Sequence, residues 1–105
     1  MSEFYTKIRG VTHEQKGVDP QRLLRHCRPG QKLMLVREPN NKWDKNAVAI
    51  CLTTGERLGY ISRDIAERLS EDLDRGVKME AEISELTGGG FFSGKERGCN
   101  IKISS

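Results

Sequence analysis

Short apolar runs and alternating apolar positions predict six strands along the chain. The clearest alternation lies in residues 77–84, where every second residue is apolar, as in a strand that buries one face. Two continuous apolar runs, 33–36 and 47–52, also have the length and composition of strands. The expected strands are 4–11, 31–36, 47–52, 57–61, 77–84 and 99–103.

Two segments carry the pattern of a short helix. Asp19-Pro20 is typical of a helix start, because the acid caps free backbone N–H groups and proline fits the first turn. A first helix is therefore expected over 20–27. Ser62 is expected to cap a second helix over 63–75. The buried face of this second helix consists of apolar residues at helical spacing: Ile65, Ala66, Leu69 and Leu73.

The connections between these elements bear on the fold class. Residues 53–56, Thr-Thr-Gly-Glu, are typical of a tight turn between neighbouring strands. Gly59 removes a side chain within a strand, which indicates that another backbone or a ligand passes close to it. A strand-rich chain with two short helices predicts a mainly β fold, a small β-barrel, formed by a single domain over 1–105.

Length and composition set limits on this domain. The chain has 105 residues, the usual size of one domain, and 35% of them are apolar. No apolar segment approaches the roughly 18 residues that a membrane span needs. The first residues lack the charged and apolar regions of a secretory signal. We therefore expect a cytoplasmic domain with a thin core and no membrane partner.

The three cysteines, Cys27, Cys51 and Cys99, lie far apart in the sequence. An odd count without short spacings argues against a disulfide framework and against a zinc site. Cys51 is expected to be a small buried residue of its strand. His26 and Cys27 are adjacent on the first expected helix, so their side chains would point in different directions and would not form a catalytic pair. No metal or cofactor is expected.

Charge is distributed unevenly along the chain. Residues 1–50 contain ten Lys or Arg and five Asp or Glu, whereas residues 51–105 contain eight and ten. The first half is therefore basic and the second half slightly acidic. A basic half suits an anionic partner without requiring one.

The most unusual stretch lies between the two continuous apolar runs. Residues 37–47 read Arg-Glu-Pro-Asn-Asn-Lys-Trp-Asp-Lys-Asn-Ala. Pro39 restricts its own backbone and that of the residue before it, so the first strand must end there. Asn and Asp side chains can bond their own backbone and so hold such a loop in one shape. Trp43, the only Trp of the chain, either folds back as a lid over the core or forms an exposed recognition surface.

Recognised catalytic motifs are absent from the sequence. There is no phosphate-binding Gly-rich loop that ends in Lys-Ser or Lys-Thr, and no dinucleotide fingerprint. A binding module is therefore favoured over an enzyme. Small barrels bind single-stranded nucleic acid through aromatic rings and basic rims, and residues 41–45 supply a ring, two lysines and polar side chains.

Two motifs together resemble the signature of the HIRAN domain family. The first is Leu-Met-Leu-Val-Arg-Glu-Pro-Asn-Asn-Lys-Trp-Asp-Lys-Asn-Ala-Val over 33–48. The second is Leu-Gly-Tyr-Ile-Ser-Arg-Asp-Ile-Ala over 58–66. The resemblance is strongest over 4–86 and implies a modified OB-like or SH3-like barrel. In eukaryotic relatives fused to a helicase-type motor, such a domain captures the 3′ end of single-stranded DNA, which links it to DNA repair. Free-standing bacterial domains of this kind also exist.

The resemblance also implies roles for individual residues. Trp43 occupies the position of the aromatic ring that stacks on the terminal nucleotide. Asp44 takes the place of the acid that accepts a hydrogen bond from the 3′ hydroxyl. Asn41 lies where a loop amide contacts the end. Tyr60 and Arg63 match a polar ring and a cation that reach the backbone phosphate.

The sequence departs from this pattern in the loop after the first strand. His13 lies where the DNA-binding relatives carry Tyr, and Thr12 lies where they carry Arg. This difference removes one stacking ring and one cation. Arg9 and Lys16 are the nearby cations that could compensate, although neither is aligned with the missing one.

Two functional hypotheses follow. The first is a module that binds single-stranded DNA or its 3′ end; the basic first half and the Trp43-Asp44 pair favour it. The second is a non-enzymatic adaptor that binds a protein partner with the same barrel. The altered His13 loop and the acidic second half favour this alternative.

Overall fold

The structure is a computed structural model that describes residues 2–11, 17–88 and 96–105. In these residues it contains every strand and both helices that the sequence predicts. The strands are β1 (Glu3–Lys7), β2 (Lys32–Arg37), β3 (Val48–Leu52), β4 (Arg57–Tyr60), β5 (Glu80–Thr87) and β6 (Gly98–Ser104). The helices are α1 (Pro20–Leu24) and α2 (Arg63–Asp74). The mainly β class is confirmed.

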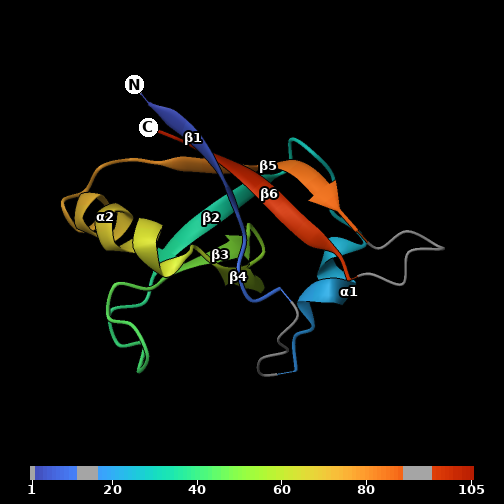
Figure 1. Cartoon of the computed structure of the whole chain (residues 1–105), viewed down its shortest axis with the longest axis horizontal. Helices are drawn as coiled ribbons and strands as arrows, with labels where there is room; N and C mark the ends of the chain where they lie inside the picture. The colour runs from blue at the N-terminus through green and yellow to red at the C-terminus, as the bar shows by residue number, and fades with distance from the viewer. Residues whose placement is uncertain (1, 12–16, 89–95) are drawn as a thin grey trace.

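All six strands belong to one antiparallel sheet in the order β1-β6-β5-β2-β3-β4. Strand β3 pairs with both of its neighbours in sequence, β2 and β4. The sheet curls into a half-barrel, with β1 and β6 crossing in front of β2, β3 and β4 (Figure 1). Register shifts in β5, between Ile83 and Glu85, and in β3, between Ile50 and Cys51, mark bulges that assist this curvature.

The segment after β1 connects the two ends of the sheet. Ile8 still donates its N–H to Cys99 of β6, but Arg9 exchanges two backbone hydrogen bonds of 2.8 Å with Tyr60 of β4. A Cβ atom at Gly59 would lie 2.3 Å from the Arg9 carbonyl oxygen and 2.6 Å from Cγ2 of Ile8. The expectation that another backbone passes close to Gly59 is therefore confirmed. The expected strand 4–11 is divided, because its second part leaves β6 to pair with β4.

The core fills the concave side of the sheet. Its fully buried large side chains come from the segment after β1, from α1 and from four strands: Ile8, Leu24, Val48, Ile50, Leu58, Ile83, Cys99, Ile101 and Ile103. Cys51 is buried in β3, as predicted. Cys99 is also fully buried, and desolvation raises the pKa of its thiol to about 12.

The start of the expected strand 77–84 was wrong. Val77 is 40% exposed, and β5 begins only at Glu80. Gly76 has a φ of 85°, and its N–H bonds to the Leu73 carbonyl while the Val77 N–H bonds to the Asp72 carbonyl. These two bonds form a Schellman motif, which ends α2 and uses Val77 for the cap rather than for the sheet.

Both helices are short, and α1 is shorter than expected. Asp19 caps α1 as predicted, since its Oδ1 accepts the Gln21 N–H at 3.0 Å. The helix ends at Leu24 instead of continuing to residue 27. Ser62 stands at the N-cap of α2 but makes no side-chain capping bond. Neither helix of the described residues is long and apolar enough to cross a membrane.

Candidate nucleic-acid interface

The loop between β2 and β3, residues 38–47, is held by its own side chains. Oδ1 of Asn41 accepts the N–H groups of Trp43 at 2.9 Å and of Asp44 at 3.1 Å. Oδ1 of Asp44 accepts the N–H of Asn46 at 2.9 Å. These bonds are Asx turns, which fix the chain direction on either side of Trp43. The loop extends beyond the sheet near the start of α2 (Figure 1).

Trp43 is exposed at the tip of this loop. Its side chain is 73% accessible, so the hypothesis that it forms a lid over the core was wrong. The Nζ atom of Lys42 lies 4.6 Å from the centre of the Trp43 ring, within the range of a cation–π contact. An indole this exposed gains little from folding, which makes it available for a ligand.

Arg63, the first residue of α2, connects the helix to the loop. Its Nη2 donates to the Trp43 carbonyl at 2.9 Å, and its Nε lies 3.7 Å from Oδ2 of Asp44. The Arg63 side chain is 72% exposed, whereas that of Asp44 is only 20% exposed. The carboxylate is thus partly enclosed, and among the described residues its Oδ2 atom has only this loose ion pair.

These residues surround a small hollow, which we call the Trp43 pocket. It has a volume of about 210 Å³ and is lined by Asn41, Trp43, Asp44, Ala47, Tyr60, Ile61 and Arg63. Five of the six residues predicted as a site from the sequence line this single pocket. The sixth, His13, lies outside the described residues, as do Thr12 and Lys16.

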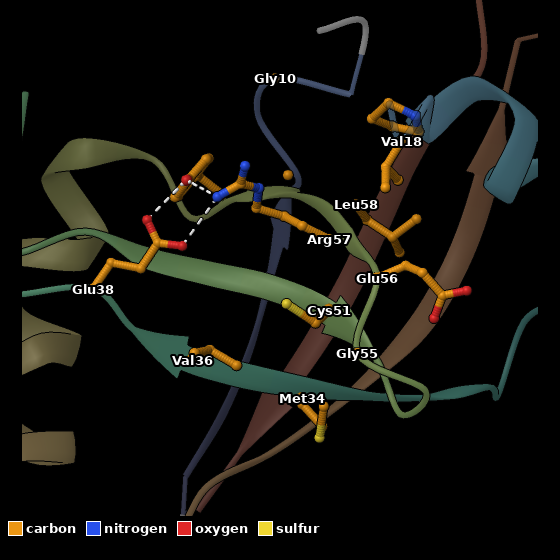
Figure 2. Close-up of a pocket in the computed structure, with 13 residues that line it drawn as sticks. Gly10, Val18, Met34, Val36, Glu38, Cys51, Gly55, Glu56, Arg57 and Leu58 are labelled. Carbon is orange, nitrogen blue, oxygen red and sulfur yellow. Dashed lines mark hydrogen bonds and ion pairs between the residues drawn. The ribbon is translucent and has the colours of Figure 1, made fainter. Parts of the chain in front are cut away.

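Behind the Trp43 pocket lies a polar cluster centred on Glu38. Its Oε1 accepts hydrogen bonds from Asn41 at 3.1 Å and from the Tyr60 hydroxyl at 2.8 Å. Its Oε2 accepts a bond from Nη1 of Arg57 at 3.1 Å. Figure 2 shows the Glu38 carboxylate and the Arg57 guanidinium turned toward one another. The cluster therefore joins the loop to β4.

The cluster lowers the pKa of Glu38 and raises the pKa of Tyr60. Burial alone would raise the pKa of Glu38, but the hydrogen bonds from Asn41 and Tyr60 and the charge of Arg57 together lower it. Burial, followed by the hydrogen bond to the Glu38 carboxylate, raises the pKa of Tyr60 to about 12. At neutral pH Glu38 is therefore ionised, and the neutral Tyr60 hydroxyl donates a hydrogen bond to it.

Two further hollows continue from the Trp43 pocket. One, of about 490 Å³, lies along the loop and shares Asn41, Trp43 and Tyr60 with the pocket. The other, also about 490 Å³, lies over β2, β3 and β4 (Figure 2), and we call it the Arg57 groove. It is lined by Gly10, Val18, Pro20, Met34, Val36, Glu38, Cys51, Gly55, Glu56, Arg57, Leu58, Gly59 and Tyr60. Tyr60 contributes to all three hollows.

The model of the HIRAN domain family matches residues 1–103. The chain belongs to the HIRAN domain family. Its fold is similar to the crystal structure of the HIRAN domain of human HLTF, with a TM-score of 0.71 and 17% identity; the match covers 96% of this chain and 72% of that one. It is also similar to a crystal structure of a Lactobacillus plantarum protein, with a TM-score of 0.68 and 19% identity, over 99% of this chain and 100% of that one.

Longer proteins share part of this HIRAN sequence. The helicase-like transcription factor of Mus musculus is 27% identical over 81 residues, which are 70% of this chain and 8% of that protein. The protein of the same name from Oryctolagus cuniculus is 36% identical over 44 residues, which are 42% of this chain and 4% of that protein. The chain thus spans less than a tenth of the length of these relatives.

Arg37 attaches the loop between β2 and β3 to the C-terminal end of α2. Its Nε and Nη2 atoms lie 3.0 and 3.3 Å from the two carboxylate oxygens of Asp74. Its Nη1 donates to the carbonyls of Lys45 and Ala47, both at 3.0 Å. One guanidinium group therefore holds the end of the loop against both β2 and α2.

The sequence analysis missed the roles of Glu38, Arg57 and Arg37. Glu38 and Arg37 lie inside the first HIRAN motif, so the motif itself was the available signal. Their partners, however, lie on β4 and α2, 19 to 37 residues away. The pattern of a single loop does not contain that pairing.

The described residues contain no cluster of three or more His, Cys, Asp or Glu that could hold a metal ion. Cys27 donates its thiol to the Leu23 carbonyl at 3.3 Å, and burial raises its pKa. Burial also raises the pKa of Cys51. Both thiols are therefore protonated at neutral pH, the opposite of what a nucleophile needs.

Proposed function

We propose that this HIRAN domain binds single-stranded DNA and captures its 3′-hydroxyl end in the Trp43 pocket. One observation carries the proposal: a 73%-exposed Trp stands in the same small pocket as a partly enclosed carboxylate and an exposed Arg. A terminal nucleotide offers the three matching groups, which are an aromatic base, a hydroxyl donor and a phosphate.

Trp43 would supply the stacking surface. Stacking of a base on an aromatic ring typically contributes about 1–3 kcal/mol and depends little on the base. The two bonds to Oδ1 of Asn41 fix the backbone of Trp43 before any ligand arrives. A ring held in this way loses less conformational entropy on binding.

Asp44 would recognise the end of the strand. A carboxylate accepts hydrogen bonds, so it can hold a 3′ hydroxyl, which donates one. Oδ1 of Asp44 is already bonded to the Asn46 N–H, so Oδ2 is the atom for this contact. A 3′ phosphate would bring negative charge against the carboxylate and would be disfavoured.

Arg63 would contact the phosphate that joins the last two nucleotides. Its attraction for a 3′ phosphate does not cancel the effect of Asp44, because Arg63 is 72% exposed and water screens it. Tyr60 and Asn41 already bond to Glu38, so their part is to shape the pocket while Arg63 supplies the charge.

Tryptophan fluorescence provides the test, since Trp43 is the only Trp of the chain. Titration with an oligonucleotide that has a free 3′ end should change the emission, and Arg63→Ala should weaken binding of every sequence. The slope of log affinity against log salt should fall by about 0.7 if one phosphate contact is lost. Arg75→Ala is the matched control, because Arg75 is 71% exposed and follows the other end of α2.

Absence of binding to single strands would overturn the proposal and favour a protein-interaction adaptor. An unchanged salt slope in Arg63→Ala would remove Arg63 from the site while leaving the stacking and hydroxyl contacts to be tested separately.

A further inference from the structure

Arg9 is an exposed cation that closure of the sheet places beside the Trp43 pocket. It lies opposite Tyr60, and the two residues exchange both backbone hydrogen bonds at 2.8 Å. Directly opposed residues of an antiparallel pair project their side chains from the same face of the sheet. Tyr60 lines the Trp43 pocket, so Arg9 projects from the sheet next to that lining.

The other arginines around these hollows already have partners. Arg57 pairs with Glu38 at 3.1 Å, and Arg37 pairs with Asp74 at 3.0 Å. Arg63 bonds to the Trp43 carbonyl. Arg9, by contrast, has no side-chain hydrogen bond or ion pair within the part of the chain that the structure describes. Its charge is therefore free to meet an anion without breaking an existing contact.

The Arg57 groove continues from Tyr60 on the same side of the molecule. Gly10, the residue after Arg9, and Gly59, against which the Arg9 backbone packs, form part of its wall, so the groove runs beside Arg9. Met34 and Val36 are 38% and 39% exposed and offer an apolar surface (Figure 2). Glu38 is neutralised by Arg57, whereas Glu56, farther along the groove, has no ion pair with a cation in residues 2–11, 17–88 or 96–105. A DNA strand, which has apolar bases and anionic phosphates, would therefore run along the side of the Arg57 groove where Arg9 lies, away from Glu56.

We propose that the DNA strand does not end its contacts at the Trp43 pocket but continues across Tyr60, and that Arg9 binds a backbone phosphate of the nucleotides that precede the terminal one. The proposal rests on the proposed function and extends it from recognition of an end to recognition of a short single strand.

The test measures how the effect of Arg9→Ala depends on strand length. The parent and the variant are titrated with a thymidine dinucleotide and a thymidine hexanucleotide, each with a free 3′ hydroxyl. The dinucleotide should bind both proteins alike, whereas the hexanucleotide should bind the variant more weakly. The ratio of the two hexanucleotide affinities should be roughly fivefold larger at roughly 50 mM than at roughly 500 mM salt, since one phosphate contact gives a slope of about 0.7.

Lys7→Ala is the matched control, because Lys7 is an exposed cation two residues away whose loss changes the net charge equally. Arg9→Lys should retain most of the salt dependence. Equal effects of Arg9→Ala and Lys7→Ala, or an Arg9→Ala effect that is the same for both strand lengths, would overturn the proposal. Such a result would leave the proposed function intact if Trp43→Ala still weakened binding. Failure of both oligonucleotides to bind the parent would overturn the proposed function and the Arg9 proposal together.

Discussion

The two connections on either side of β3 differ in length and in the bonds that hold them. The turn between β3 and β4 reverses the chain with backbone bonds: Leu52 donates to the Glu56 carbonyl at 2.9 Å, and Gly55 donates to the Leu52 carbonyl at 2.8 Å. Gly55 supplies the required φ of 105°. The loop between β2 and β3 is longer and is held mainly by the side chains of Arg37, Glu38, Asn41 and Asp44.

The comparison shows what the longer connection adds. A hairpin needs only two residues to reverse direction, so the extra residues of 38–47 are not needed for the sheet. They instead hold a large aromatic ring in water, where it contributes little to the core. A loop of fixed shape that carries an exposed ring suits the proposed binding site. The short turn between β3 and β4 carries no such ring, so substitutions there can serve as controls.

The largest expected effect comes from Trp43→Ala. Loss of the stacking ring should reduce affinity for every single-stranded sequence by roughly tenfold or more, as expected for about 1–3 kcal/mol of stacking. Stability should hardly change, because the side chain is exposed. Thr54→Ala in the short turn should leave affinity unchanged. Equal affinities of the parent and Trp43→Ala, measured by fluorescence anisotropy of a labelled oligonucleotide, would contradict the stacking role.

A smaller loss of affinity is expected when Glu38 is replaced. Glu38 holds the loop but does not line the Trp43 pocket. Glu38→Ala leaves the Asn41 amide and the Tyr60 hydroxyl without their acceptor and removes the ion-pair partner of Arg57, which keeps its hydrogen bond to the Tyr60 hydroxyl. It should therefore lower stability by about 1–3 kcal/mol. Affinity should also fall, since the Asn41 side chain, whose Oδ1 accepts the Trp43 and Asp44 N–H groups, loses its anchor on Glu38. Glu38→Gln retains one acceptor oxygen and should lie between the parent and Glu38→Ala in chemical denaturation and in titration. A Glu38→Ala variant as stable as the parent would contradict this role.

Tyr60 predicts a pH dependence at the alkaline end. Its pKa is about 12 in the folded protein against an ordinary value of 10.0. The neutral side chain therefore contributes stability that is fully present below pH 10 and is lost as the pH rises through about 12. Tyr60→Phe should remove this part of the alkaline destabilisation. The free energy of unfolding of both proteins, measured between these pH values, gives the comparison; parallel curves would contradict it.

Local patterns predicted most of the fold but only part of the site. Apolar runs, alternation and capping identified the strands and both helix starts of the described residues, because those signals are local. Val77 was misassigned because its alternation with Met79 is also compatible with a helix cap, and the choice depends on the φ of Gly76. The two HIRAN motifs together supplied Trp43, Asp44 and Arg63, which the structure brings to one pocket. From the sequence Arg9 was only one of two nearby cations, because its place beside Tyr60 follows from a sheet closure that no local pattern contains.

The central claim is that the Asp44 carboxylate selects a hydroxyl end. Competition between two oligonucleotides of one sequence, with a 3′ hydroxyl or a 3′ phosphate, tests it most directly when the parent and Asp44→Asn are compared. The asparagine retains an oxygen for the Asn46 N–H but has no negative charge. The parent should prefer the hydroxyl end, and Asp44→Asn should lose most of that preference while still binding single strands. Equal binding of the two ends by the parent, or an unchanged preference in Asp44→Asn, would contradict end capture.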